Sequence, residues 1–153
     1  MFGKDLGQYV RFEKPLLYIV AAVGLARLAL SLGGLPDATV RWLSMTVVTW
    51  AGIFYYGAAV HARGFGSYKH LLPLGFLLMV LVQSIAVLGI LLSIAGLPNI
   101  YAAPEFSFQA QSQWVHLLAH LTVGIVVPSL LFWGVGSLVL LVAKRLAPRP
   151  VAA

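Results

Sequence analysis

The sequence predicts an all-α integral membrane protein, an up-and-down bundle of four transmembrane helices with both termini in the cytoplasm. Three observations support this fold class. Hydrophobic residues make up 61% of the 153 residues and charged residues only 9%, which is far from the composition of soluble domains. Four long runs carry almost no charge, and lysines and arginines gather in alternate segments between them. We expect one transmembrane domain that comprises residues 1–153.

The first predicted span covers residues 16–34 and is interrupted only by Arg27. It is long enough to cross the roughly 30 Å hydrocarbon core of a bilayer. The basic tail before it, with Lys4, Arg11 and Lys14, also resembles the start of a signal peptide. An arginine within the apolar stretch and the lack of a small-residue cleavage site favour a transmembrane helix.

The second and third predicted spans, residues 42–60 and 71–97, carry no charged side chain. The fourth, residues 114–143, is interrupted only by His116 and His120. The last two spans exceed the about 20 residues that a helix needs to cross the bilayer. We therefore expect tilt, extension beyond the lipid, or a kink at the proline of the fourth span.

The distribution of lysine and arginine predicts the orientation. The N-terminal tail, the loop 61–70 and the C-terminal tail hold most of the basic residues, so the positive-inside rule assigns all three to the cytoplasm. The segment 35–41 has a single basic residue, Arg41, and the segment 98–113 has none. We expect both to face outward, with residues 98–113 as a loop on the outer interface.

Composition excludes several classes of function. The net charge of +6 is explained by residues that flank the membrane, and no water-facing basic surface remains for nucleic acid. The absence of cysteine rules out thiol chemistry. The chain has four carboxylates, and none lies in a hydrophobic run, so we expect no buried acid of the kind that proton-coupled exporters use. These carboxylates are Asp5, Glu13, Asp37 and Glu105.

Polar residues at one depth predict a pocket. Counted from the outer ends of their spans at 1.5 Å per residue, Arg27, Thr49 and His120 all lie about 10 Å below the outer interface. His116 lies one turn above His120, and Glu105 belongs to the loop that covers this end. Because polar groups in membrane helices turn toward protein, these residues predict a polar pocket that opens outward.

Each of these residues also has a structural interpretation. Arg27 is shallow enough to reach the outer headgroups, to cap backbone carbonyls or to pair with Glu105. His116 and His120 lie near a helix end, where histidines usually serve as interfacial or packing residues. Gln83, near the middle of the third span, is either an interhelical hydrogen-bond partner or a ligand contact.

The histidines do not predict a metal centre or an active site. His116 and His120 share one helical face, but a metal ion needs further ligands, and Leu117 stands where zinc proteases have glutamate. A haem needs histidines from facing helices, so it would have to lie between two protomers. His61 and His70 flank the inner loop, where we expect them to be exposed. With no acid to orient a base, the sequence favours a non-enzymatic role.

We expect the pocket to bind a lipid headgroup, a quinone or another amphiphile around Arg27 and His120. The alternative is a non-catalytic accessory or assembly subunit, in which the small residues Gly89 and Ser93 dock against a larger membrane complex or a second copy. A second alternative is a redox subunit that holds haem between protomers. The partners we expect are membrane lipids and either further copies of this chain, in a homo-oligomer, or a larger membrane complex. The alanine- and leucine-rich composition favours a bacterial inner membrane.

Overall fold

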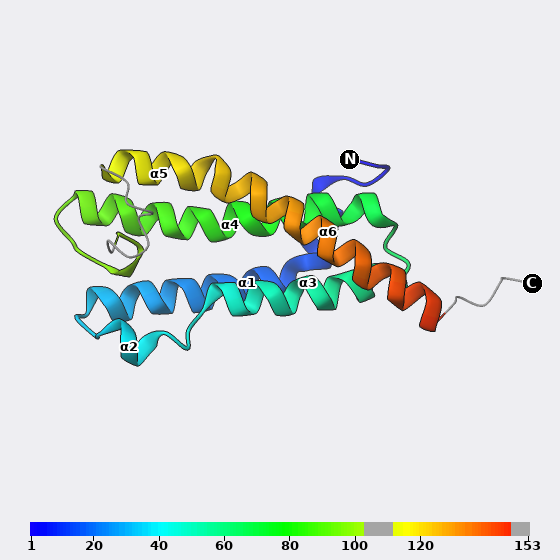
Figure 1. Cartoon of the computed structure of the whole chain (residues 1–153), viewed down its shortest axis with the longest axis horizontal. Coiled ribbons are helices and arrows are strands. Elements are labelled where there is room, and N and C mark those ends of the chain that lie inside the picture. The colour runs from blue at the N-terminus through cyan, green and yellow to red at the C-terminus, as the bar shows by residue number, and fades with distance from the viewer. Residues whose placement is uncertain (103–111, 148–153) are drawn as a thin grey trace, which may run out of the picture.

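A computed structural model describes residues 1–102 and 112–147. All regular secondary structure in these ranges is helical. The elements, labelled in Figure 1, are α1 (Leu6–Leu32), α2 (Asp37–Val40), α3 (Met45–Ala62), α4 (Tyr68–Ile94), the 3₁₀ turn η1 (Ile100–Ala102), α5 (Gln113–Leu121) and α6 (Val123–Leu146).

The described residues contain four stretches that are long and apolar enough to cross a membrane. They are Leu6–Leu32, Asp37–Ala62, Tyr68–Ile94 and Gln113–Leu146. The predicted all-helical fold with four apolar helices is confirmed, and these helices indicate a membrane protein. The orientation with both termini in the cytoplasm stays a prediction.

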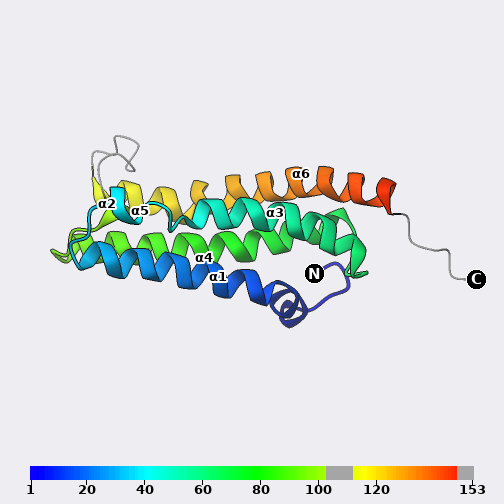
Figure 2. The same ribbon diagram turned by 90° about the horizontal axis from the view of Figure 1, so that it is seen from below.

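The long helices run side by side, with α4 in contact with α1, α3, α5 and α6. Helix α6 also crosses α3, as Figure 1 and the turned view of Figure 2 show. The start of α1 and the end of α6 lie at one end of the bundle, which we call the terminal end. Helix α2, η1 and the start of α5 lie at the other, the α2 end. Fully buried side chains fill the space between the helices, including Tyr9, Val20, Tyr56, Leu74, Leu78, Phe132 and Leu140.

Glycines let two pairs of helices approach closely. A Cβ atom on Gly57 of α3 would lie 2.8 Å from the carbonyl oxygen of Gly136 in α6. A Cβ atom on Gly75 of α4 would lie 2.8 Å from Cβ of Phe132. Small residues commonly permit such contacts between membrane helices. Gly57 and Gly75, which lack side chains, therefore let α6 pack closely against α3 and α4.

Helix α1 begins at Leu6, well before the predicted start of the first span. Asp5 caps it: its side chain accepts a hydrogen bond from the backbone of Gln8, and the Gln8 side chain accepts one from the backbone of Asp5. This reciprocal arrangement is a capping box. The extra turns carry Glu13 into the bundle, where it is 0% exposed.

The prediction that no carboxylate is buried was therefore wrong. It treated Glu13 as part of a tail, whereas α1 continues through this residue. Both carboxyl oxygens of Glu13 lack a hydrogen-bond partner within the described part of the chain.

The fourth predicted span consists of two helices. Helix α5 ends at Leu121 and α6 begins at Val123, with Thr122 between them at φ −114° and ψ −86°. A kink at Pro128 was one of three features expected of this long span; Pro128 lies inside α6, and the helix is interrupted earlier, at Thr122.

His61 and His70 are buried, contrary to the expectation that they are exposed. These residues retain 8% and 6% exposure, and Ala147 and Phe2 lie against their imidazole rings. The His70 Nδ1 accepts the N–H of Ser67, so its Nε2 carries the proton and donates to the carbonyl oxygen of Phe2. The Nε2 of His61 lies 2.7 Å from the carbonyl oxygen of Ala147.

Candidate functional site: a polar cavity at the α2 end

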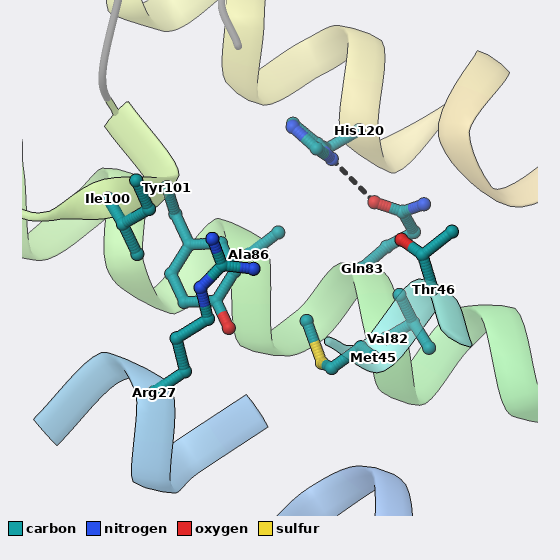
Figure 3. A pocket seen from close by; sticks show the side chains of 9 residues that line it. All are labelled: Arg27, Met45, Thr46, Val82, Gln83, Ala86, Ile100, Tyr101 and His120. Atoms are coloured by element: carbon teal, nitrogen blue, oxygen red, sulfur yellow. Dashed lines mark hydrogen bonds between the residues drawn. The ribbon is translucent and has the colours of Figure 1, made fainter. Parts of the chain in front are cut away.

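A cavity of about 240 Å³ lies between the helices toward the α2 end. Figure 3 shows that side chains from α1, α3, α4, η1 and α5 converge on it. Its lining consists of Arg27, Met45, Thr46, Val82, Gln83, Ala86, Ile100, Tyr101 and His120. Five polar side chains therefore face the cavity together with four apolar ones, and such a mixture suits a small-molecule site.

Gly24, Arg27 and Ser31 of α1, which are spaced three and four residues apart, all face protein. Gly24 packs so closely against Met45 that an added Cβ would lie 2.4 Å from the methionine sulfur. Ser31 accepts the backbone N–H of Ile100 at 2.9 Å. Arg27 lies between these contacts, and its side chain is only 15% exposed. The arginine therefore extends into the cavity and does not reach out of the bundle.

Arg27 is paired with Asp37 of α2. Its Nη2 donates to the Asp37 carboxylate at 2.5 Å. The buried Nε of the same guanidinium has no hydrogen-bond partner within residues 1–102 and 112–147. The predicted alternative partner, Glu105, lies outside the described residues. The described residues thus leave one donor of the guanidinium unused, although Asp37 balances its charge.

Tyr101 closes the cavity on the η1 side. Its hydroxyl donates to the carbonyl oxygen of Gly24 at 3.1 Å. Asn99 holds the turn in place by accepting the backbone N–H of Tyr101 and donating to the carbonyl oxygen of Gly89. Burial raises the pKa of the Tyr101 phenol, and the nearby Arg27 guanidinium opposes that shift. The phenol is therefore a neutral hydrogen-bond donor at neutral pH.

The cavity wall opposite Tyr101 is formed by side chains, and hydrogen bonds between α4, α5 and α6 hold it in place. The amide nitrogen of Gln83 donates to the carbonyl oxygen of Gly124 at 2.8 Å, which orients the amide oxygen toward His120. That oxygen lies 2.5 Å from Nδ1 of His120, and Figure 3 draws this contact. Because the amide oxygen can only accept, His120 carries its proton on Nδ1.

The second ring nitrogen of His120 faces His116. The two Nε2 atoms are 3.0 Å apart. A neutral His120 protonated on Nδ1 can only accept at Nε2, so His116 donates this bond. Within the described part of the chain, no third His, Cys, Asp or Glu side chain joins the pair in a cluster suited to a metal ion.

Pro128 explains why Gly124 offers its carbonyl oxygen to Gln83. A proline has no N–H, so it leaves the carbonyl of the residue four positions earlier without its helical partner. In α6 that carbonyl belongs to Gly124. The absence of a side chain at Gly124 also makes room, because an added Cβ would lie 3.0 Å from Cδ of Gln83.

The structure brings together some of the predicted site residues. Arg27, Gln83 and His120 line the same cavity, and His116 forms a hydrogen bond with His120. Thr49 does not line the cavity, and its hydroxyl is buried without a hydrogen-bond partner among the described residues. Whether any of these residues binds a ligand stays a prediction.

Thr46 takes the place that was predicted for Thr49. Ser44 caps α3, so the helix begins at Met45, and residues 41–44 form a turn. The depth of Thr49 was counted from Trp42 as if the helix began there, whereas the helix begins at Met45. The cap at Ser44 is the sequence signal that marks this start.

Asp37 and Tyr101 were missed as neighbours of Arg27. Asp37 was identified only as a loop carboxylate, and Tyr101 only as a residue of the outer loop. Nothing in the sequence pattern shows that α2 and η1 fold back over Arg27, because both are short elements whose positions depend on tertiary contacts.

Gly89 is not available to a partner helix. An added Cβ would lie 2.7 Å from the Tyr101 ring and 2.9 Å from the Asn99 side chain. Ser93 accepts a hydrogen bond from the side chain of Gln113 at 3.3 Å. Segments of the same chain therefore contact both residues of the predicted docking face.

No protein-family model matches this sequence, and comparisons with curated proteins and with solved structures found no match either.

Proposed function

We propose that this cavity binds the polar head of a membrane amphiphile, such as a lipid headgroup or a quinone. The observation that supports the proposal is the position of Arg27, whose guanidinium lines the cavity with a buried Nε–H donor that the described residues leave unused. A buried donor without an acceptor is costly, and an oxygen of a bound ligand would satisfy it.

The other polar groups favour an anionic or carbonyl-bearing head. A guanidinium presents donors in a planar fork that suits carboxylate, phosphate and carbonyl oxygens. Asp37 balances the charge of Arg27 from the more exposed side, with 36% exposure of its side chain. Thr46 adds a hydroxyl on the α3 side. The ring nitrogens of His120 are engaged by Gln83 and His116, so this side chain shapes the wall of the cavity.

The charge pattern of the two ends supports a cavity in the outer half of the membrane. The terminal end carries most basic residues of the described chain, namely Lys4, Arg11, Lys14, Arg63, Lys69, Lys144 and Arg145. By the positive-inside rule this end faces the cytoplasm. The cavity, at the α2 end, then opens toward the outer leaflet of what we propose is a bacterial inner membrane.

Native mass spectrometry of the detergent-purified protein tests the proposal. We expect a stoichiometric adduct on the wild-type chain and its loss in Arg27→Ala. Arg41→Ala is the matched control, because Arg41 follows α2 and does not line the cavity. An adduct that persists in Arg27→Ala, or a wild-type chain that retains no ligand, would contradict the proposal.

The two alternative functions have less support. An accessory subunit that docks through Gly89 and Ser93 would use a face that the chain already covers with Asn99 and Tyr101. A haem between protomers would require His116 or His120 to give up the bond that joins them. The absorption spectrum of the same purified sample tests the haem hypothesis directly.

A further inference from the structure

A second cavity lies directly behind the wall formed by Gln83 and His120. Its volume is about 510 Å³, and we call it the α4–α6 groove. Both residues that form the wall also line the Arg27 cavity, so one layer of side chains separates the two spaces. The groove is lined by Gln83, His116, Ala119, His120, Val123, Gly124, Val127 and Pro128.

The groove is open toward the surface of the helix bundle. Val123 is 61% and Val127 is 48% exposed. In a chain that spans a membrane, this surface faces the hydrocarbon of the lipids. Beyond the wall and His116, the lining consists of valine, alanine, glycine and proline, which offer hydrocarbon surface and no charge.

Local sequence explains why α6 leaves a groove here. Helix α5 ends at Leu121 and α6 begins at Val123, so the helix is interrupted beside the groove. Gly124 presents no side chain toward Gln83. The combination of the helix break and the missing side chain keeps α6 from filling the space beside α4.

We propose that the groove holds the hydrocarbon chain of the amphiphile whose head occupies the Arg27 cavity, and that the Gln83–His120 pair is the gate between them. This inference rests on the proposed function, since it assigns the remainder of the same ligand. The occupant is an amphiphile with one anionic or carbonyl-bearing head and at least one long hydrocarbon chain.

The arrangement of the two cavities supports this single occupant. The Arg27 cavity contains the guanidinium, and the α4–α6 groove opens to the region of the bilayer that holds hydrocarbon chains. A ligand that enters from the bilayer reaches the groove first and the guanidinium second. The hydrogen bond between Gln83 and His120 lies in the wall that separates the two spaces. The Gln83–Gly124 bond anchors Gln83 on the groove side.

The combination of a polar cavity and an apolar groove also implies selectivity for the kind of ligand that binds. A head without a chain gains nothing from the groove, whereas an apolar molecule without a head has no oxygen for the Arg27 Nε. The site therefore favours amphiphiles whose head binds in the Arg27 cavity while their hydrocarbon chain lies in the α4–α6 groove.

Dodecyl phosphate is a suitable probe because it has one anionic head and one saturated chain. We would measure its occupancy by native mass spectrometry on the detergent-purified full chain. Val127→Trp fills the groove, and Ala119→Trp fills it from α5. Val126→Trp is the matched control, because Val126 is 54% exposed on the same helix but does not line the groove. Thermal melting of each variant checks that it is folded.

We expect occupancy to fall at least tenfold in Val127→Trp and in Ala119→Trp, and to stay at the wild-type level in Val126→Trp. Wild-type occupancy in both groove variants, together with loss in Arg27→Ala, would overturn the groove assignment and leave the cavity proposal standing. Wild-type occupancy in Arg27→Ala would overturn the proposed function itself. Equal loss in Val126→Trp and Val127→Trp would also contradict the groove assignment.

Discussion

The side-chain amide of Gln83 donates to the carbonyl oxygen of Gly124, and this bond connects the middle of α4 to the start of α6. The acceptor exists because Pro128 cannot donate to it. The same amide orients its oxygen toward His120 and thereby fixes the proton of that ring on Nδ1. One proline in α6 thus determines the hydrogen bonding of a histidine in α5 through a glutamine in α4.

Replacing Gln83 by leucine should destabilise the protein. Leucine is similar in size but leaves the Gly124 carbonyl and the His120 Nδ1–H without partners in a buried site, and each orphaned group costs about 1–3 kcal/mol. The measurement is the thermal unfolding of the variant in detergent. Ser84→Ala is the control, because Ser84 is exposed and bonds only to its own helix at Val80. Equal melting temperatures for the two variants would contradict the hydrogen-bond network.

Two glycines on neighbouring helices should respond oppositely to alanine. In Gly57→Ala the new methyl group meets the Gly136 carbonyl and Cβ of Val139, both at 2.8 Å, and we expect a loss of about 1–3 kcal/mol from overpacking. In Gly134→Ala it meets no atom within 4 Å, and helix propensity predicts a gain of up to about 1 kcal/mol. Thermal melting of both variants tests the close contact between α3 and α6. A stable Gly57→Ala variant would disprove that contact.

Glu13→Met should stabilise the bundle. The wild-type carboxyl is fully buried, and its oxygens have no hydrogen-bond partner in the described chain. Methionine has a similar unbranched shape and removes the unsatisfied oxygens, so the free energy of unfolding should rise by about 1–3 kcal/mol. Glu13→Gln keeps polar atoms at the site and should gain less. A lower melting temperature for Glu13→Met would show that the carboxyl makes an interaction in the membrane that stabilises the fold.

Cysteine labelling in intact cells tests the predicted orientation. The chain has no native cysteine, so single substitutions report on one position each. Thr39→Cys in α2 and Ala62→Cys at the end of α3 are both at exposed positions, at opposite ends of the bundle. A membrane-impermeant maleimide should label the first in intact cells and the second only after lysis. The reverse pattern would invert the topology and place the cavity in the inner leaflet.

The long helices could be predicted because hydrophobicity alone defines them. Their ends could not be placed as well, because the ends depend on single polar residues. Asp5 and Gln8 start α1 before the apolar run begins, and Ser44 starts α3 after Trp42. The break at Thr122 has neither glycine nor proline at its position, so no sequence signal marks it.

Cavity residues whose depth follows from helical periodicity were predicted. Residues whose positions depend on tertiary folding were missed. Arg27 and His120 share a cavity because both depths follow from the helical rise. The Asp37 partner of Arg27 and the position of Tyr101 depend on how α2 and η1 fold across the end of the bundle. The burial of Glu13 likewise depends on the turns that α1 adds before its apolar run.

Methyl NMR of the methionines tests most directly whether the cavity binds an amphiphile. The chain has three methionines. Met45 lines the cavity, and Met79 is buried elsewhere in the core with 3% exposure. Titration of the ¹³C-methyl-labelled protein with dodecyl phosphate should shift the Met45 resonance in a saturable way and leave Met1 and Met79 in place. An unchanged Met45 resonance at saturating probe, or equal shifts of all three, would contradict binding in this cavity.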